Sequence, residues 1–517
     1  MFRRRITATV AGAVALGLFA TACSGPEEST GGDGDGEAGA FTYRMPGRFA
    51  DWLNDLNQFP VLQEEAGVEV ELVDGGGSEN YYQQIDLDLT SEGLGDAAIV
   101  NLAQMQVYGP QGALVDLAPL LEEQAPNVAA YLAENEEFRQ LVTNEDGQIF
   151  GLIAERPSIG TLPFYRADMF AEAGIDEPPN TVEEFADALR ALKETYGEDS
   201  NYYPMTGRDF FINMFYAFEA GFSIDDQGTL HGAYDESTGL SFDLHAPRFE
   251  EMIAWYKDLY DEGLIDPIWV QGSASEEDWQ AQLLNGQASV SRDFFTRPSW
   301  FMQNGGPEND PDFQMDVLPA FETPDGEQLT MTSNALFDSS RVFAIDARSE
   351  NVEEVLGFLD YLYSDEGQRL LHYGVEGESY EMADGEPQYL VEFEDVAASP
   401  VGTPVWAFHQ DRLTFPAPVD NAAYYDFLDD FTSSFAQEHF SENAEPHPVI
   451  KYSPDQLEER LELKASMQPA MVAGLTAFVT GDRPLSEWSA FVTEMDEIGR
   501  ERMAEIDQEA YDAMQNL

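Results

Sequence analysis

Apolar residues recur at two different spacings along the first part of the chain. The run FTYRM from Phe41 predicts a first strand and the start of folded structure, and the alternating run VEVELV at 68–73 predicts a second strand. Helical spacing predicts helices over Trp52–Glu65 and about Tyr81–Thr90, and a further strand is predicted over Ala97–Asn101. Strands that alternate with helices are typical of a mainly parallel sheet covered on both faces, and such sheets bind ligands beyond the carboxyl ends of their strands.

Capping signals predict where later helices begin. Thr181 and Glu184 form a capping box, since each side chain satisfies a backbone N–H of the other residue, and the helix that follows is predicted to run through Leu192. A capping residue also precedes helical stretches at Ser364–Leu371 and at Leu485–Met495. Helices are therefore predicted throughout the chain and not only in its first part.

The first 23 residues have the features of a lipoprotein leader. Residues 3–5 are three arginines, residues 6–19 are apolar but too few to span a bilayer comfortably, and residues 20–23 (ATAC) form a small-residue cleavage site that ends in the only cysteine. We therefore predict a signal peptide over 1–22 and an acylated Cys23 that anchors the protein to the extracellular face of the cell membrane. An ordinary secretory signal is the alternative.

A flexible tether is predicted after the leader. Residues 23–40 consist mainly of Gly, Ser, Asp and Glu, with nothing apolar enough to start a core. Their DGDGE portion lacks the later glutamate of a calcium-binding loop, so we assign it no metal. The predicted organisation is a signal peptide at 1–22, an acidic Gly-rich tether at 23–40 and a folded part at 41–517.

Composition sets the chemistry open to the folded part. No cysteine remains after Cys23, which excludes disulfides, a thiol nucleophile and cysteine-based metal sites. The chain is 43% hydrophobic, with 34 Phe, 22 Tyr and 7 Trp, enough to build substantial cores for two or three domains or one large two-lobed protein. No second apolar run approaches the length of a membrane span. We therefore expect a soluble body outside the cell.

Charge adds a second constraint. The chain has 98 acidic and 25 basic residues, a formal net charge of −73, and loss of the three leader arginines would bring it to −76. Such a surface repels nucleic acid and anionic lipid headgroups, so we exclude nucleic-acid binding that depends on neutralising phosphates. Its self-repulsion is screened by salt, and the near absence of lysine, with four in the whole chain, favours adaptation to salty surroundings.

Several segments, found in the expected order, resemble one protein family. They are GALVDLAPLLEEQAPNVAAYLAENEEFRQ (112–140), DGQIFGL (146–152), FYRADMFAEAGIDEPPNTVEEFADALRALK (164–193), WYKDLYDEGLIDP (255–267), YLYSDEGQRLLHYGVEGESYEMADGEPQY (361–389) and FVTGDRPLSEWSAFVTEMDEIG (478–499). Together they are similar to the lipoprotein subgroup of family 1 extracellular solute-binding proteins, the substrate receptors of ABC importers.

The resemblance implies an α/β fold of the type II periplasmic-binding-protein kind, with two discontinuous lobes joined by crossing strands that close on a ligand. It also implies a monomeric, non-enzymatic receptor without a cofactor, which delivers a carbohydrate, often an oligosaccharide and sometimes one containing uronate, to an ABC permease. Residues 146–152 would form a turn into a buried strand that crosses towards the second lobe near 151–155. Gly374 and Gly377 are predicted turn glycines.

The chain departs from the family pattern at one place. Many relatives carry a calcium-binding-like loop between the helix that corresponds to Val182–Lys193 and the following Tyr-Pro. Here only the junction Thr195–Pro204 is present, without alternating oxygen ligands, so we assign no metal.

Enzymatic signatures are largely missing from the sequence. The six histidines show no H-E-x-x-H spacing, there is no G-x-S-x-G, and the Gly-rich runs lack a following Lys-Ser/Thr. A polysaccharide lyase or glycoside hydrolase stays open as an alternative, because 98 acidic residues always include suitable carboxylate pairs. A peptide-binding receptor and a ligand-sensor module also stay open as functions of such a chain.

Candidate ligand contacts combine aromatic rings with groups that form paired hydrogen bonds, which is what sugar recognition requires. Arg48 and Trp52 follow the first predicted strand, although Trp52 could equally be a core residue of the next helix. Arg292 and Trp300 lie in the cluster SRDFFTRPSW (291–300), where an internal salt bridge is the alternative role for the arginine.

Further candidates are spread along the chain, and the commoner role for their large aromatics is in a core. They are Glu155, Arg156, Arg208, Asp209, Trp269 and Trp406. The arginines among the candidates slightly favour an acidic saccharide over a neutral one.

Overall fold

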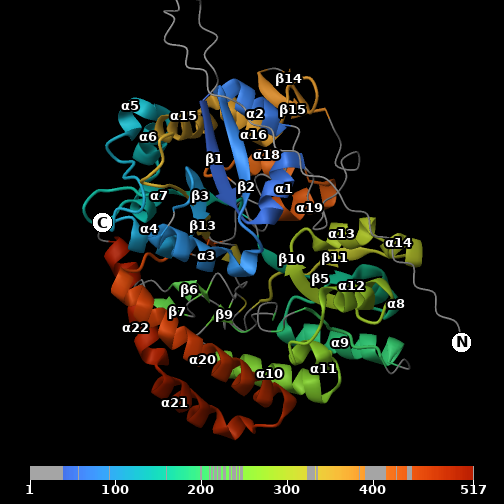
Figure 1. The fold of residues 1–517 in the computed structure, drawn as a ribbon. Coiled ribbons are helices and arrows are strands. Elements are labelled where there is room, and N and C mark those ends of the chain that lie inside the picture. Colours follow the sequence, from blue (N-terminus) through green and yellow to red (C-terminus); the bar gives the residue numbers. More distant parts are fainter. Residues whose placement is uncertain are drawn as a thin grey trace, which may run out of the picture. The chain divides into compact units, whose positions relative to one another are not determined.

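The structure is a computed structural model, and it describes most of the chain from Gly39 onwards (Figure 1). The described residues are 39–55, 58–91, 93–158, 160–197, 201–208, 248–322, 336–383, 385–390, 415–426, 428–438 and 448–515, with short pieces at 210, 214, 218, 223–224, 229–231, 234–235, 240–241, 244, 326, 332–333 and 445–446. The predicted signal peptide and Cys23 lie outside these residues.

The larger sheet has five strands in the order β2-β1-β3-β13-β4 (Figure 1). β1 (Gly39–Met45) pairs in parallel with β2 (Val68–Asp74) and β3 (Ala97–Val100). β13 (Phe337–Ile345) runs antiparallel between β3 and β4 (Leu152–Glu155). The predicted mainly parallel sheet is therefore confirmed, although its first strand begins at Gly39 rather than at Phe41.

Helices pack against this sheet around the first hydrophobic core. Phe41 of β1 contacts Phe358 of α15 edge-on, with ring centroids 5.6 Å apart. Tyr81 of α3 donates its hydroxyl to the carbonyl of Ile99 at 2.9 Å. The helices of this lobe are α1 (Gly47–Asp55), α2 (Gln58–Ala66), α3 (Ser78–Thr90), α4 (Leu102–Tyr108), α5 (Leu121–Gln124), α6 (Pro126–Glu134), α7 (Glu136–Val142), α15 (Val352–Leu362) and α16 (Asp365–Tyr373).

The single helix predicted over residues 52–65 is wrong, because two helices, α1 and α2, occupy this region. Pro60 is the physical reason. Its nitrogen has no hydrogen to donate to the carbonyl of residue 56, and its ring clashes with that carbonyl, so a helix that starts upstream cannot continue through it. As the third residue of α2, Pro60 lies in the first turn, where proline is tolerated.

The second sheet has the order β10-β5-β11 and is antiparallel throughout. β5 (Thr161–Arg166) lies between β10 (Val290–Phe294) and β11 (Met315–Val317). The helices of this lobe are α8 (Ala167–Glu172), α9 (Val182–Tyr196), α10 (Phe249–Asp261), α11 (Pro267–Val270), α12 (Glu276–Leu284), α13 (Arg297–Gln303), α14 (Gly306–Asn309), α18 (Asn421–Asp426), α19 (Asp430–Ala436), α20 (Pro454–Thr480), η4 (Leu485–Glu487), α21 (Trp488–Ile498) and α22 (Arg500–Gln515).

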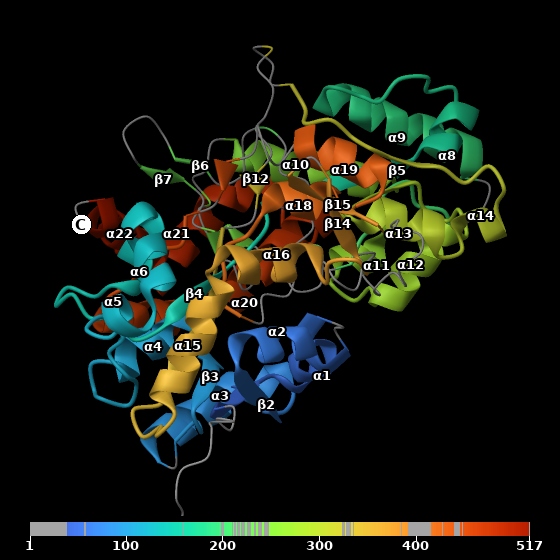
Figure 2. The same ribbon diagram turned by 90° about the horizontal axis from the view of Figure 1, so that it is seen from above.

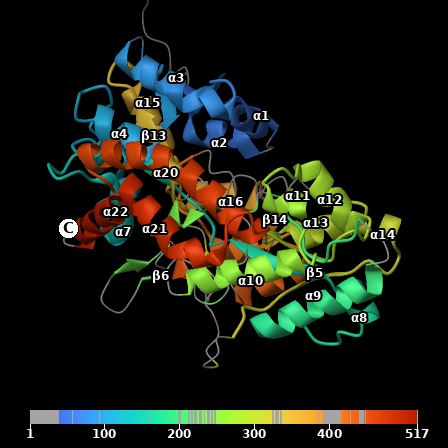
Figure 3. The same ribbon diagram turned by 90° about the horizontal axis from the view of Figure 1, so that it is seen from below.

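The second lobe is assembled from distant parts of the chain. Figures 2 and 3 show the second sheet and its helices from two further directions, and α20 packs against α10 although some 200 residues separate them. Short two-stranded pairs complete the fold: β6 (Ser223–Ile224) with β7 (Leu230–His231), β8 (Tyr234–Asp235) with β9 (Leu240–Ser241), β12 (Thr332–Ser333) with β16 (Glu445–Pro446), and β14 (Tyr380–Ala383) with β15 (Glu386–Tyr389).

The helix starts predicted at Thr181 and Ser364 and the two turn glycines are confirmed, whereas the capped start predicted at Leu485 is wrong, because residues 485–487 form the 3-10 turn η4 without a side-chain cap and the α-helix begins at Trp488. The backbone N–H of Glu184 donates to the hydroxyl of Thr181 at 3.2 Å, and the N–H of Thr181 donates to the Glu184 carboxylate at 3.3 Å. Ser364 caps α16 in the same way, by accepting a hydrogen bond from the N–H of Gly367. Gly374 and Gly377 have φ angles of +82° and +83°, which only glycine adopts without strain.

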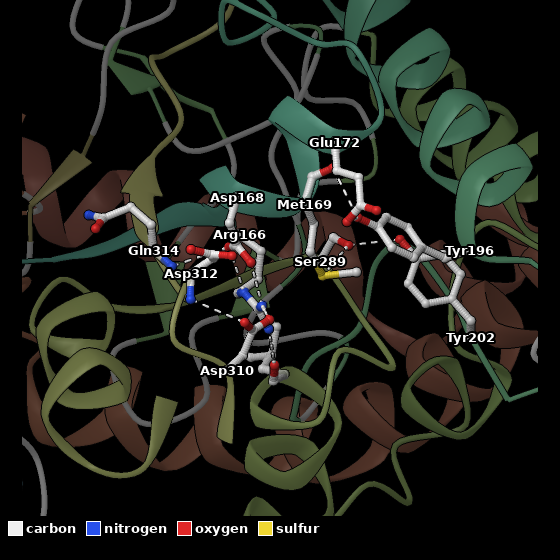
Figure 4. A network of polar contacts seen from close by, with 11 residues as sticks. Arg166, Asp168, Met169, Glu172, Tyr196, Tyr202, Ser289, Asp310, Asp312 and Gln314 are labelled. Atoms are coloured by element: carbon white, nitrogen blue, oxygen red, sulfur yellow. Dashed lines mark hydrogen bonds and ion pairs between the residues drawn. The ribbon is translucent and has the colours of Figure 1, made fainter. Parts of the chain in front are cut away.

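A buried arginine is the last residue of β5, and Figure 4 shows the polar contacts around it. Arg166 is 2% exposed and donates to both carboxylate oxygens of Asp168, at 2.8 and 2.5 Å, and to the carbonyl of Leu283 at 3.0 Å. Beside it, the hydroxyls of Tyr202 and Ser289 lie 2.7 Å apart. Ser289 also accepts the N–H of Arg166 at 2.8 Å and donates its hydroxyl to the sulfur of Met169 on α8 at 3.3 Å, so the network joins α8, β5 and the segment that follows α9 within the second lobe.

Candidate functional site

Within the described parts of the chain, three segments pass between the two lobes and are hydrogen-bonded to one another. The N–H of Arg156, directly after β4, donates to the carbonyl of Leu336, directly before β13, at 2.8 Å. The N–H of Ser158 donates to the side-chain oxygen of Asn421 at 2.9 Å. The predicted crossing near residues 151–155 is therefore found immediately after Glu155, and it is joined to the crossing at 336 and to the segment 418–421.

Glu155 ends β4 at this crossing. Its carboxylate accepts a short hydrogen bond from the hydroxyl of Tyr131 on α6 and one of 3.2 Å from the N–H of Val419. Withdrawal from water raises the pKa of Glu155 to about 7, although both hydrogen bonds act in the opposite direction. One carboxyl group thus connects the first lobe to the segment 418–421.

An arginine pair surrounds a buried carboxylate at the same edge of the sheet. Asp338 is fully buried, and its carboxylate is 2.6 Å from the guanidinium of Arg156 and 3.2 Å from that of Arg341. Burial alone would raise the pKa of Asp338, but the two guanidinium groups and the Ser340 hydroxyl outweigh it and lower this pKa to about 2. The carboxylate is therefore ionised and fixed between two cations at neutral pH.

Parallel strands place this carboxylate where α/β sheets bind ligands. β4 runs parallel to β1 and β3, so Glu155 and Arg156 lie at the edge that carries the carboxyl ends of all three strands. β13 starts at this edge, which puts Asp338 and Arg341 beyond the end of β3. The aromatic ring of Phe49, on the helix that follows β1, lies 4.7 Å from the guanidinium of Arg341.

A second charged cluster lies at the end of β10 in the other lobe. Asp293 is fully buried and accepts two hydrogen bonds from Arg208, at 2.6 and 3.0 Å. It also accepts one of 3.2 Å from Arg297, whose other end donates to Glu276 at 2.7 Å. The N–H of Phe295 donates to the carbonyl of Gly160 at 3.1 Å, so this cluster lies beside the crossing segment that follows Glu155.

Aromatic rings accompany the second cluster. Phe294 is 39% exposed, unusual for a large apolar side chain, and its ring centroid lies 5.5 Å from the guanidinium of Arg208. Trp300 is partly buried on α13, and the guanidinium of Arg297 lies 5.6 Å from its ring. An exposed ring next to guanidinium groups can stack against the apolar face of a sugar while N–H groups donate to hydroxyls.

Sequence comparison identifies the family. The sequence profile described as "Bacterial extracellular solute-binding protein" matches residues 49–369, which is more than half of the chain. The chain belongs to this family. The family predicted from the six segments of the sequence is therefore confirmed.

This solute-binding protein matches two curated relatives over about half of their length. Lipoprotein LipO of Bacillus subtilis (strain 168) is 26% identical over 288 residues, 53% of this chain and 54% of LipO. The fructooligosaccharide ABC transporter substrate-binding protein FusA of Streptococcus pneumoniae serotype 4 is 22% identical over 323 residues, 59% of this chain and 56% of FusA.

Solved structures of similar proteins cover nearly the whole chain. The alginate-binding protein AlgQ2, without calcium ion, has a TM-score of 0.70 at 19% identity and covers 92% of this chain and 98% of its own. FusA in complex with kestose has a TM-score of 0.67 at 18% identity, and the match covers 92% of this chain and 99% of FusA. At this identity the likeness shows the fold, and the predicted two-lobed α/β periplasmic-binding-protein fold is confirmed.

The structure brings some of the predicted ligand contacts together and separates others. Arg208, Arg292 and Trp300 lie at or near the end of β10, and Arg292 is a partly buried residue of that strand. Glu155 and Arg156 lie at the crossing described above. Phe294, Asp338 and Arg341 were not predicted, although the exposed Phe294 stands inside the predicted 291–300 cluster.

Trp269 takes no part in this arrangement. Its side chain is fully buried in the core of the second lobe, with the ring of Phe210 at 4.9 Å. A Cβ atom on Gly207 would come within 2.6 Å of its indole nitrogen, so glycine there lets the backbone close over the ring. Because a buried ring has no face to offer a sugar, we leave Trp269 out of the proposed site.

Four of the predicted contacts have no described side chain. Arg48 and Trp52 belong to α1, but their side chains lie outside the described part of the structure, and Asp209 and Trp406 lie outside the described residues altogether. Among the described residues, no group of three or more His, Cys, Asp or Glu side chains is placed to hold a metal ion. None of the described helices has the length and apolar character needed to cross a membrane.

Proposed function

We propose that this protein is a membrane-anchored extracellular receptor that binds an oligosaccharide and delivers it to an ABC permease. Membership of the solute-binding family and the similarity to FusA, a fructooligosaccharide-binding protein, support the class of ligand. The observation that carries the proposal is the exposed ring of Phe294 beside Arg208, at the end of β10 and next to the chain crossing.

The ligand would be held from both lobes. In the first lobe, Arg156 and Arg341 supply guanidinium groups at the carboxyl edge of the larger sheet, and in the second lobe Arg208 and Phe294 supply a guanidinium and a ring. A ligand that contacts both lobes binds the closed arrangement better than the open one and shifts the balance by that difference in affinity. Closure on the ligand is thus part of the proposal.

The ion pairs favour a neutral saccharide over a uronate. In the second lobe Asp293 and Glu276 together balance Arg208 and Arg297, and in the first lobe the fully buried Asp338 balances one of the two guanidinium charges of Arg156 and Arg341. A uronate carboxylate would compete with these buried partners and would also meet the negative field of the whole chain. Hydroxyl groups need only N–H donors and acceptors, without a net charge.

Anchoring through Cys23 is the second part of the proposal. The leader pattern at 1–23 and the similarity to LipO, a lipoprotein, support acylation of this residue. The Gly- and Asp-rich residues 23–40 would then act as a flexible tether between the membrane and the folded part.

Calorimetric titration tests the binding proposal. Fructo-oligosaccharides, malto-oligosaccharides, oligoalginate and short peptides would each be titrated into the protein, and we expect binding of a neutral oligosaccharide without turnover. Phe294→Ala should weaken this binding about tenfold, or 1.4 kcal/mol, because the stacking ring is lost. Leu461→Ala, which shortens a side chain that is 51% exposed on α20, is the matched control and should bind normally.

Each of the following results would contradict one part of this proposal. Equal affinity in wild type and Phe294→Ala would remove the end of β10 from the site. Selective binding of oligoalginate would overturn the neutral-saccharide assignment, binding of a peptide alone would overturn the carbohydrate class, and release of shorter sugars during the titration would reveal a hydrolase or lyase.

A further inference from the structure

A hollow lies between α16 and the segment that leads into α18. It has a volume of about 300 Å³ and is lined by Arg369, His372 and Tyr373 on one side and by Val419, Asp420 and Asn421 on the other. None of the residues proposed above to contact the oligosaccharide lines it. Ligand pockets span about 300–1,000 Å³, so this volume lies at the lower end of the range and suits one sugar ring or a polyol of that size.

The wall of the hollow combines one cation with one carboxylate. Arg369 forms a long ion pair with Glu366, at 3.5 Å, and Asp420 is held in place by the N–H of Ala423 at 3.0 Å and by the hydroxyl of Tyr373. Asn421 adds a side-chain amide. A ligand rich in hydroxyl groups matches this mixture, because each hydroxyl both donates and accepts.

Charge around the hollow argues against an anionic ligand. The Nε2 atom of His372 faces two acceptors, Gln368 Oε1 at 2.9 Å and the carbonyl of Pro418 at 3.0 Å, and these acceptors favour the tautomer with its ring hydrogen on Nε2. Burial lowers the pKa of His372 to about 4, so the ring is neutral at pH 7. Burial raises the pKa of the Tyr373 hydroxyl, and three carboxylates, those of Asp420, Asp426 and Glu386, lie near enough to raise it further. Arg369 is the cation among the residues that line the hollow, so carboxylates outnumber cations around it.

The same segment connects the hollow to the crossing between the lobes. Val419 donates its N–H to Glu155, and Asn421 accepts the N–H of Ser158. A molecule that contacts Val419, Asp420 and Asn421 therefore contacts the backbone that fixes the crossing. If this molecule binds the open and closed arrangements with different affinities, its binding changes the affinity of the protein for the oligosaccharide. The oligosaccharide then changes the affinity for this molecule by the same factor, because coupling between two sites is reciprocal.

We propose that this hollow is a second binding site, for a single neutral sugar ring or a polyol of similar size, and that its occupancy is coupled to oligosaccharide binding through residues 418–421. The site itself stands on the hollow and its lining. The coupling rests on the function proposed above.

Titration of the full-length protein with D-glucose, D-galactose, D-fructose and glycerol, without any oligosaccharide, tests the site. At least one of these probes should bind, and Arg369→Gln should weaken it by about tenfold or more. Arg139→Gln is the matched control, since Arg139 is an exposed helical arginine with a glutamate three residues before it, as Arg369 is. Asp420→Asn keeps the acceptor for Ala423 and should also weaken the probe.

The oligosaccharide-site variant separates this proposal from the previous one. Phe294→Ala should leave the affinity for the probe unchanged. If the two sites are coupled, a saturating concentration of the probe changes the affinity for the oligosaccharide. The oligosaccharide then changes the affinity for the probe by the same factor. The proposal is overturned if none of the four probes binds, or if a probe is lost in Phe294→Ala and kept in Arg369→Gln. Binding of the probe that depends on Arg369, in a protein that binds no oligosaccharide, would refute the coupling and the receptor function while leaving the site.

Discussion

Glu155 stands between the hydroxyl of Tyr131 and the N–H of Val419, at the point where the chain leaves the first lobe. Withdrawal from water raises its pKa to about 7, well above the value of about 4.3 for a free glutamate. The folded protein therefore holds this proton more tightly than the unfolded chain does. The stability that Glu155 contributes is fully present below the unfolded pKa and is lost as the pH rises through 7.

The difference in unfolding free energy between the wild type and Glu155→Gln tests this expectation. The many other carboxylates titrate alike in both proteins, so their contributions cancel in this difference. The unfolding free energy of the wild type, relative to that of the variant, should fall between about pH 4 and pH 7 and level off at higher pH when measured by urea denaturation. Glu134→Gln changes an exposed carboxyl on the same helix as Tyr131 and should show no such trend. Parallel curves for Glu155→Gln and wild type would contradict the raised pKa.

Part of the candidate site could be predicted residue by residue, and β10 shows why the rest could not. The sequence SRDFF drew attention to arginine and aromatic residues together, but hydropathy predicts that Asp293 faces water and that Phe294 is buried. The structure has the reverse, since Arg208 and Arg297 compensate the charge of Asp293 and allow its burial. Arg208 is far away in sequence, so no local pattern shows this pairing.

At the scale of elements, the capping box of α9 should have a measurable effect on stability. Thr181→Ala removes the oxygen that accepts the N–H of Glu184, and loss of such a cap costs about 1 kcal/mol. The midpoint of urea unfolding followed by circular dichroism should therefore fall. Thr195→Ala, near the other end of the same helix, removes only a hydrogen bond to the Ala191 carbonyl and should leave the midpoint nearly unchanged. An equal shift in both variants would mean that the cap has no special role.

Helix starts could be predicted because capping is local, with both partners within four residues. Sheet order could not, because β13 comes from residues 337–345 and inserts antiparallel between β3 and β4. Its position depends on packing across more than 180 residues of intervening chain. The crossing after Glu155 was predicted from family resemblance, whereas its link to the segment 418–421 emerges only from the folded structure.

At the scale of the whole molecule, the excess of acid exceeds what the ion pairs can neutralise. Arg502 alone is shared by three glutamates, Glu459, Glu505 and Glu509, and Arg190 is held by Asp187 and Glu262. With 98 acidic and 25 basic residues, most carboxylates have no basic side chain to pair with, whatever the fold. Folding brings these charges closer together than they are in the unfolded chain, so their repulsion opposes folding.

Salt should therefore stabilise this protein strongly. The Debye length falls from about 30 Å at 0.01 M salt to about 3 Å at 1 M, so repulsion between separated carboxylates is largely screened at the higher concentration, whereas contacts such as that of Asp338 with Arg156 are buried and screened much less. The unfolding midpoint measured by calorimetry should rise continuously with sodium chloride over this range. Sucrose of the same osmolality controls for solvent exclusion and should give a smaller rise, since it leaves the charges unscreened. A midpoint that is independent of salt, or that falls with it, would show that the acidic surface is not what limits the stability of the fold.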